Sequence, residues 1–167
     1  MANEEARPMT ELSVAAPAFV EIAHKIVWAT VATVDPSGAP RTRVLHPIWE
    51  WDGSTLTGWV ATSPLSPKAK HLAHDARVSV TYWDQGHDTC TADCVAIWEL
   101  DEVSRRAGWD RFASAPEPVG YDPTIIPGWT DPMADAFGIV RLEPTALRVQ
   151  PVAVMTGQGG SVSMWRA

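Results

Sequence analysis

Cysteine is scarce in this chain of 167 residues, which contains only Cys90 and Cys94. Two cysteines cannot supply the disulfide framework of a small secreted domain. Their spacing from His87 raises the question of a metal site, but it also places both thiols on one face of a predicted strand. Free cysteine commonly behaves as a small buried hydrophobic residue, so we expect packing here rather than metal binding.

Long hydrophobic runs and an excess of basic residues are also missing. No apolar segment approaches the roughly 20 residues that a membrane-spanning helix needs. The N-terminal segment, MANEEARPMTELS, is polar and acidic, unlike a signal peptide. The 13 Lys and Arg residues face 20 Asp and Glu residues, for a net charge of −7, which argues against binding to nucleic acid. We therefore expect a cytoplasmic protein that binds neither a membrane nor nucleic acid.

Tryptophan, by contrast, is abundant, with nine residues in the chain. Hydrophobic residues make up 46% of the sequence and charged residues 20%, which is typical of a globular protein. The length suits one domain with a proper core. We expect this domain over residues 15–155, with a flexible N-terminal tail over residues 1–14 and a C-terminal tail over residues 156–167.

The pattern of apolar residues predicts mostly strands. Turn residues such as Asp35-Pro36-Ser37-Gly38 and Asp52-Gly53 separate predicted strands over residues 27–34, 41–51, 55–62, 77–83, 89–100, 137–142 and 146–152. Short helices are predicted over residues 17–25, after Ser66, and over residues 102–112. Six or seven twisted strands tend to close on themselves. The predicted fold class is therefore mainly β, an antiparallel barrel with short helices.

The start of the helix after Ser66 has an unusual charge pattern. Ser66 suits the N-cap, and Pro67 suits the first helical position. Lys68 and Lys70 then fall in the first turn, where the positive end of the helix dipole disfavours cations. The two lysines either lie on a solvated face or help to hold an anion at this helix start, for which a phosphate is the obvious candidate.

Two longer blocks carry a family resemblance. The segments VWATVATVDPSGAPRTRVLHPIWEWDG and VATSPLSPKAKHLAHDARVSV resemble the pyridoxamine 5′-phosphate oxidase-like group of flavin-binding split β-barrels, and CVAIWELDEVSRRAGWDRF and FGIVRLEPTALRV fit the same group. The resemblance implies a homodimer with cofactor sites at the subunit interface. It also implies that FMN, or the deazaflavin coenzyme F-420, serves an oxidoreductase with a small organic substrate.

The resemblance also implies which residues contact the cofactor. Thr62 and Lys68 match the positions that hold the phosphate, with Ser63 and Ser66 close by. The segment of the second predicted strand that lies against the isoalloxazine and the phosphate is matched by Arg41, Arg43, Val44 and His46. No side chain is assigned as a catalytic acid, base or nucleophile, because the cofactor supplies the redox chemistry.

The chain departs from the vitamin-making oxidases at two points. Pro67 stands where those enzymes have an Arg before the phosphate-binding Lys, and nothing after Leu147 matches their Arg-x-His substrate motif. Pyridoxamine phosphate is therefore not the expected substrate, and the altered phosphate site leaves room for a differently charged cofactor. The alternative function is a non-enzymatic flavin or haem carrier, or a stress-related module.

Residues 113–135 contain five prolines and no periodicity. A structureless stretch of that length is usually functional or flexible. The backbone has more conformational freedom at Gly120 and Gly128 than elsewhere in this segment. Tyr121 and Trp129 supply planar apolar surfaces. We expect a stiff flap over the open face of the cofactor; the alternative is that Trp129 packs against the barrel.

Overall fold

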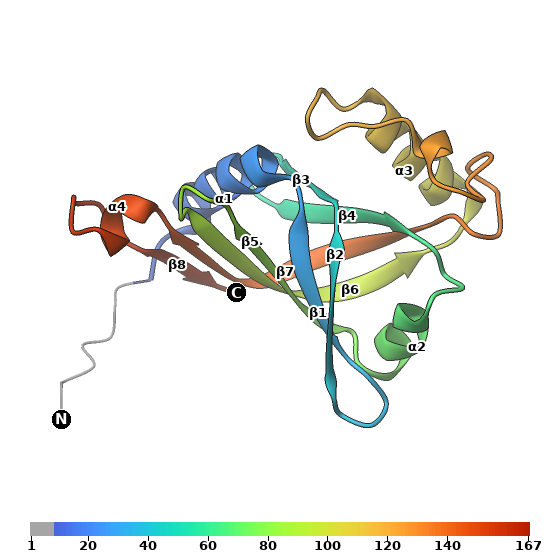
Figure 1. Ribbon diagram of the computed structural model, residues 1–167, viewed down its shortest axis with the longest axis horizontal. Coiled ribbons are helices and arrows are strands. Elements are labelled where there is room, and N and C mark those ends of the chain that lie inside the picture. Colours follow the sequence, from blue (N-terminus) through green and yellow to red (C-terminus); the bar gives the residue numbers. More distant parts are fainter. Residues whose placement is uncertain (1–8) are drawn as a thin grey trace.

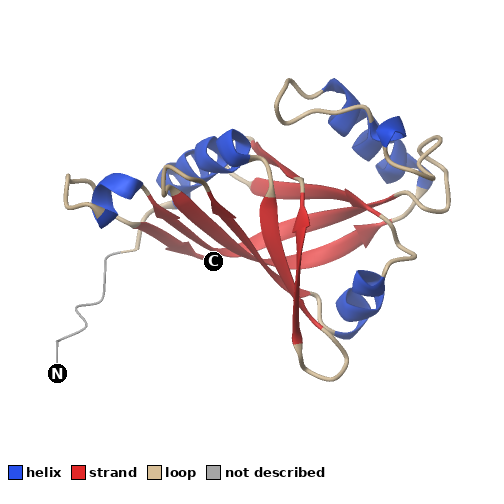
Figure 2. Ribbon diagram, viewed as in Figure 1, coloured by secondary structure: helices blue, strands red, loops and turns tan. Residues whose placement is uncertain are grey.

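The computed structural model describes residues 9–167, and residues 1–8 of the predicted N-terminal tail lie outside the described part. The helices are α1 (Leu12–Ile26), α2 (Pro67–His74), α3 (Glu102–Ser114) and α4 (Val152–Met155), with a 3-10 helix at Pro123–Ile125. The strands are β1 (Ala29–Val34), β2 (Pro40–Leu45), β3 (Pro47–Trp51), β4 (Leu56–Thr62), β5 (Arg77–Trp83), β6 (Thr89–Glu99), β7 (Gly138–Gln150) and β8 (Ser163–Arg166). The helices lie around the strands (Figure 2).

The strands form one antiparallel sheet in the order β2-β1-β5-β6-β7-β4-β3, and β8 pairs with the C-terminal half of β7. Its two edges, β2 and β3, are consecutive in the chain and only His46 lies between them. The chain itself therefore brings the edges together, and the sheet curls into a barrel (Figure 1). The predicted mainly β barrel is confirmed.

The predicted strand over residues 41–51 is wrong as a single element. The chain changes partners at His46: β2 pairs with β1, whereas β3 pairs with β4. Pro47 begins β3 and lacks the N–H that an uninterrupted ladder would use. The residue before a proline stays extended, so the chain passes from β2 to β3 at His46 without a loop.

The prediction of two separate strands over residues 137–142 and 146–152 is also wrong, because β7 is continuous. Pro144 pairs with Cys94, and the next pair joins Ala146 to Asp93. The intervening Thr145 is a bulge whose hydroxyl donates to the Asp93 carbonyl at 3.1 Å. A bulge absorbs one extra residue, so the proline does not end the strand.

Both ends of the described chain are more ordered than the sequence indicates. Helix α1 begins at Leu12, within the predicted tail, because Ala15, Ala16 and Phe19 are buried against the sheet while Pro17 faces outward. In the predicted C-terminal tail, residues 163–166 form β8 and pair with β7.

The barrel interior is organised around Trp49. Its indole N–H donates to the Tyr82 hydroxyl at 2.8 Å, and the edge of the Phe19 ring approaches it with centroids 4.8 Å apart. A Cβ on Gly58 would lie 2.7 Å from the Trp49 ring. A glycine is therefore needed opposite this tryptophan.

Cys90 and Cys94 are both buried in the same core as Trp49. Burial raises the pKa of each thiol, which keeps it protonated and apolar in character. Among residues 9–167 no group of three or more metal-ligating side chains comes together. No helix of the described chain is long and apolar enough to span a membrane.

Candidate functional site

Two cations from different elements meet near the mouth of the barrel. Arg43 extends from β2, and Lys68 lies in the first turn of α2; both line one small cavity together with Thr33 and Thr62. The Lys68 ammonium donates to Thr62 Oγ1 at 2.7 Å and to Ser66 Oγ at 2.8 Å. The structure therefore brings together four of the predicted site residues, namely Arg43 from β2, Thr62 from the end of β4, and Ser66 and Lys68 from the start of α2.

The Arg43 guanidinium is held from the side of β1. Its two terminal nitrogens donate to the Val31 carbonyl at 3.0 Å and to Thr33 Oγ1 at 2.7 Å. Thr33 is buried, with 4% of its surface exposed. A guanidinium has five N–H donors, so these two bonds fix its orientation and leave other donors available.

Within residues 9–167, no carboxylate forms a hydrogen bond or ion pair with Arg43 or Lys68. Burial lowers the pKa of Lys68, and the neighbouring Arg43 charge lowers it further. Burial also lowers the pKa of Arg43. Two half-buried cations without a counter-charge are unfavourable by themselves, and an anion is the group that would stabilise both.

The residues around the start of α2 position Lys68 of this cation pair. Ser66 makes no side-chain cap bond; its hydroxyl instead donates to the Ser63 carbonyl at 2.6 Å and accepts from Lys68. The Ser63 hydroxyl accepts from the Leu65 N–H at 3.2 Å. Ser63 therefore shapes the turn that presents Ser66 and Lys68.

Arg41 lies apart from the cation pair. Its guanidinium pairs with Asp35 at 2.8 Å in the turn between β1 and β2. Asp35 also accepts from the backbone and hydroxyl of Ser37, and these bonds together with Arg41 hold the pKa of its carboxyl well below the usual range. The charge of Arg41 is balanced locally, so it does not add to the unpaired charge of Arg43 and Lys68.

An aromatic pocket of about 380 Å3 adjoins the cation pair, and Thr62 lines both. The His46 ring lies in it, with centroids 5.1 Å from Trp28 and 5.1 Å from Tyr121. Its remaining walls are mainly apolar, and the lining consists of Val27, Trp28, Val44, Leu45, His46, Ala61, Thr62, Pro118, Gly120, Tyr121, Ile125, Ile126 and Trp129. This pocket therefore contains no side chain with a permanent charge.

His46 has an unsatisfied polar atom in this pocket. Its Nε2 atom is buried and has no hydrogen-bond partner. Burial lowers the pKa of His46, so the ring is neutral at pH 7. A buried polar atom without a partner costs about 1–3 kcal/mol, and in a native structure such an atom points to a missing ligand or water.

The proline-rich segment forms one wall of the aromatic pocket. Trp129 is buried, its indole N–H donates to the Ala136 carbonyl at 2.9 Å, and it packs edge-on against Phe137 with centroids 5.0 Å apart. Trp129 thus anchors the segment. Trp129 also lines the pocket, together with Tyr121 and the exposed Ile125, and the role of this segment as a flap stays a prediction.

Sequence reasoning missed several residues of the site. Trp28, Ile125 and Thr33 carry no local signal, because their neighbours come from distant parts of the chain. His71 did carry one: it lies three residues after Lys68 on α2, a spacing that places both on one helix face. Its Nδ1 lies 3.0 Å from Thr33 Oγ1 and 3.5 Å from the Arg43 guanidinium.

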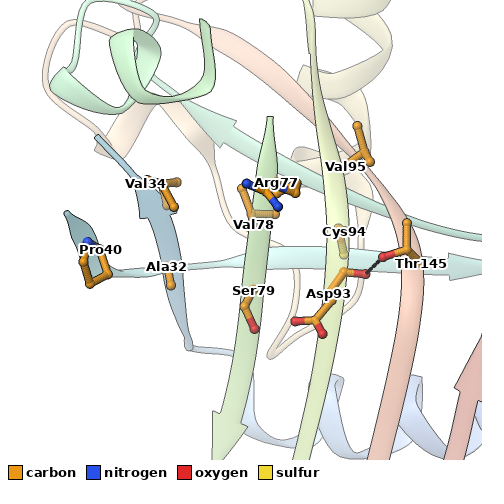
Figure 3. Close-up of a pocket in the computed structure, with 11 residues that line it drawn as sticks. Ala32, Val34, Pro40, Arg77, Val78, Ser79, Asp93, Cys94, Val95 and Thr145 are labelled. Carbon is orange, nitrogen blue, oxygen red and sulfur yellow. Dashed lines mark hydrogen bonds between the residues drawn. The ribbon is translucent and has the colours of Figure 1, made fainter. Parts of the chain in front are cut away.

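A second, shallower hollow of about 550 Å3 lies against β1, β5 and β6 (Figure 3). Small or apolar side chains form much of it, among them Ala32, Val34, Ser79 and Val95. The one interaction drawn there is the bond from Thr145 to the Asp93 carbonyl (Figure 3). The charged residues Arg77 and Asp93 also line the hollow (Figure 3).

Comparisons with known proteins agree with this architecture. The model of the family described as pyridoxamine 5′-phosphate oxidase matches residues 15–150. No curated protein matches the chain. A solved structure from Clostridium acetobutylicum, of a protein related to general stress protein 26, superposes with a TM-score of 0.67 at 10% identity, covering 93% of this chain and 94% of that one.

Two further solved structures have the same fold. An FMN-binding protein from Nostoc punctiforme is 15% identical, with a TM-score of 0.66 over 93% of this chain and 89% of that chain. The haem storage protein HutZ from Vibrio cholerae is 22% identical, with a TM-score of 0.60 over 81% of this chain and 94% of that chain. Similar barrels thus occur in an FMN-binding protein and in a haem storage protein.

Proposed function

Because the chain belongs to the pyridoxamine 5′-phosphate oxidase family, we propose that it is an FMN-dependent oxidoreductase acting on a small uncharged organic molecule. The carrying observation is the pair Arg43 and Lys68, which has no carboxylate among residues 9–167 and adjoins an aromatic pocket. A flavin mononucleotide has matching parts: a phosphate for the cations and a planar ring for the pocket. The unpartnered His46 Nε2 is consistent with a ligand in that pocket.

The residues of the chain would bind and orient the cofactor. Lys68 and Arg43 offset the phosphate charge, with the hydroxyls of Thr62 and Ser66 beside them. Val44 and His46 lie along the pocket, where apolar walls exclude water. When bound, the flavin supplies hydride or electron transfer.

The part of the pocket that the flavin ring leaves open would also restrict the substrate. It contains no permanently charged side chain, and burial keeps His46 neutral. An anionic substrate would lose hydration there without gaining a counter-charge. A phosphorylated vitamin would therefore be a poor fit, and an uncharged planar molecule is the substrate class that we propose.

The cation pair and the aromatic pocket together would also accept the phosphate-bearing deazaflavin coenzyme F-420. Both cofactors offer a planar ring and an anionic chain, so the cation pair does not discriminate between them. Pro67, which has no charge, makes the start of α2 less cationic than a site with Arg and Lys in sequence. The FMN proposal keeps the deazaflavin as its alternative within the same class of reaction.

A haem carrier is the second candidate function, and His46 favours it. A neutral imidazole with an unpartnered Nε2 in an apolar pocket has the character of a haem iron ligand. The similar fold of a haem storage protein supports considering this candidate. Arg43 and Lys68 would then meet the haem propionates.

We also propose that the chain forms a homodimer. Trp28 and Val44, both 61% exposed, lie at the aromatic pocket, and the hollow over β1, β5 and β6 offers a further packing surface. A second copy would cover apolar area that is unfavourable in water. Light scattering should report a dimer; a particle of 18.2 kDa at micromolar concentration would contradict the proposal.

The absorption spectrum of the purified protein tests the cofactor directly. FMN gives a flavin spectrum, the deazaflavin a different one, and haem a Soret band. If the protein is purified without a chromophore, each cofactor is titrated, with riboflavin as the control that lacks the phosphate. Binding of FMN no tighter than riboflavin would remove the phosphate assignment.

A further inference from the structure

Tyr121 supplies a phenol to the proline-rich wall of the aromatic pocket. The side chain lines the pocket and is half-buried, and burial raises the pKa of its hydroxyl to about 12. The phenol therefore stays protonated near neutral pH and keeps a hydrogen to donate. Within residues 9–167 this hydroxyl makes no hydrogen bond, whereas the buried Tyr82 hydroxyl accepts from the Trp49 indole. A phenol that is drawn out of water without a partner is unfavourable, and a ligand oxygen would satisfy it.

The position of Tyr121 is fixed by the chain around it. Its backbone N–H donates to the Phe112 carbonyl at 2.9 Å, near the end of α3. A Cβ at the preceding Gly120 would overlap the Ala115 carbonyl oxygen, so only glycine allows this close return of the chain to α3. The Tyr121 ring packs against the fully buried Phe112 ring, with centroids 5.4 Å apart, and against His46 at 5.1 Å. The phenol is thus held in place before any ligand binds.

The other polar side chains of the pocket are less suited to donate to a ligand. The Thr62 hydroxyl accepts from Lys68 and belongs to the cation pair, and the Trp129 indole already donates to the Ala136 carbonyl. Trp28 is 61% exposed, so its N–H is open to water. His46 Nε2 can donate or accept according to the tautomer of the ring, but the phenol can donate in either case.

We propose that the Tyr121 hydroxyl donates a hydrogen bond to the substrate, and that the substrate is an uncharged planar compound with a conjugated carbonyl group. The apolar and aromatic walls suit the planar hydrocarbon part, and the phenol suits one acceptor oxygen. A carbonyl oxygen that accepts electrons gains negative charge, which a hydrogen-bond donor already in position stabilises. The inference rests on the proposed function, whose substrate class it narrows.

Acetophenone and ethylbenzene are matched probes for this contact, because they share one ring and a similar shape but only acetophenone has an oxygen. Their dissociation constants are measured by NMR titration in the presence of saturating FMN. The readout is the ratio of the two constants, in which changes in apolar contacts largely cancel. Tyr121→Phe should shift this ratio roughly fivefold in favour of ethylbenzene, as expected for one neutral hydrogen bond.

Trp28→Phe is the matched control in the same pocket. It removes the indole N–H and part of an aromatic wall but leaves the phenol, so both probes should bind more weakly and their ratio should stay as in wild type. Isotope-edited infrared spectra of bound acetophenone give a second readout. The carbonyl stretch should lie at lower frequency in wild type than in Tyr121→Phe, because a hydrogen bond weakens the C=O bond. A purely structural role of Tyr121 would not produce this difference.

Three results would overturn the role of Tyr121: an unchanged ratio in Tyr121→Phe, the same shift in Trp28→Phe, or a wild-type protein that does not bind acetophenone. Weaker FMN binding by Tyr121→Phe with an unchanged ratio would assign the phenol to the cofactor instead. If Tyr121→Phe does not fold, a wild-type carbonyl stretch equal to that of acetophenone in an apolar solvent also overturns the proposal.

The outcomes also separate this inference from the proposed function. If FMN fails to bind the wild-type protein while the ratio still depends on Tyr121, the carbonyl preference of the pocket stands and the flavin assignment fails. If FMN binds and the ratio does not depend on Tyr121, the flavin assignment is unaffected and the substrate inference fails.

Discussion

Replacement of Lys68 by Met is the most direct perturbation of the anion site. The variant keeps the aliphatic stem that lines the barrel mouth and removes the ammonium group that contacts Thr62 and Ser66. Affinity for FMN should fall, because the phosphate loses one of its two half-buried cations. Riboflavin, which has no phosphate, should bind equally to both proteins.

The magnitude follows from the environment of Lys68. A charge-assisted hydrogen bond contributes about 1.5–3 kcal/mol when shielded from water. Lys68 is only about half-buried, so solvent screening favours the lower end. About 1.5 kcal/mol corresponds to roughly tenfold in the dissociation constant. Apo stability should change little, because relief of the repulsion from Arg43 opposes the loss of the bond to Thr62.

Quenching of FMN fluorescence during titration measures this loss. The matched control is Lys70→Met, which removes the exposed lysine of the same helix turn and the same net charge. If Lys68→Met remains folded by circular dichroism and binds FMN as tightly as wild type, the reasoning about the phosphate is wrong. Equal losses in both variants would show a general charge effect instead of a specific site.

The core and a surface ion pair give three further tests. Gly58→Ala should lower the melting temperature, because its Cβ would lie 2.7 Å from the Trp49 ring and overpacking of this kind costs about 1–3 kcal/mol. Tyr82→Phe should destabilise the fold by about 1–3 kcal/mol in urea unfolding, because the buried Trp49 N–H loses its acceptor. The bonds from Arg77 lower the pKa of Asp75 to about 2. This pair therefore stabilises the fold fully at pH values above the ordinary carboxyl pKa, and its contribution to stability disappears as the pH falls toward about 2. Acid unfolding of Asp75→Asn should therefore be less pH-dependent than that of wild type over this range, and identical curves would contradict the assignment.

The parts of the site that could be predicted from sequence are those formed by neighbours in the chain. Ser66 and Pro67 predict a helix start by their side-chain chemistry, Lys68 follows directly, and Thr62 ends the preceding strand. Their spacing is short enough that the local backbone nearly determines their positions. The contacts of Lys68 with Thr62 and Ser66 are what that spacing indicates.

The other parts of the site and of the fold depend on contacts between residues that are distant in the sequence, which no local pattern predicts. Arg41 and Arg43 both point from β2, yet the turn acid Asp35 pairs with Arg41 and leaves Arg43 for the site. Proline marks strand ends in general, but the bulge at Thr145 carries β7 past Pro144. In both cases a tertiary partner decided between alternatives that the sequence left open.

The pairing of β4 with β7 has a consequence for how the protein is made. Gly58 pairs with Leu142, and about half of the chain lies between them. The hairpins β1–β2 and β3–β4 form from near neighbours, whereas distant pairings carry a larger loop-closure entropy and form more slowly. As the chain leaves the ribosome, the ends of β2 and β4 exist early but are linked only through His46 and the β3–β4 hairpin. We expect the barrel to close around them only after β7 has been synthesised, so the proposed ligand site should form late in translation.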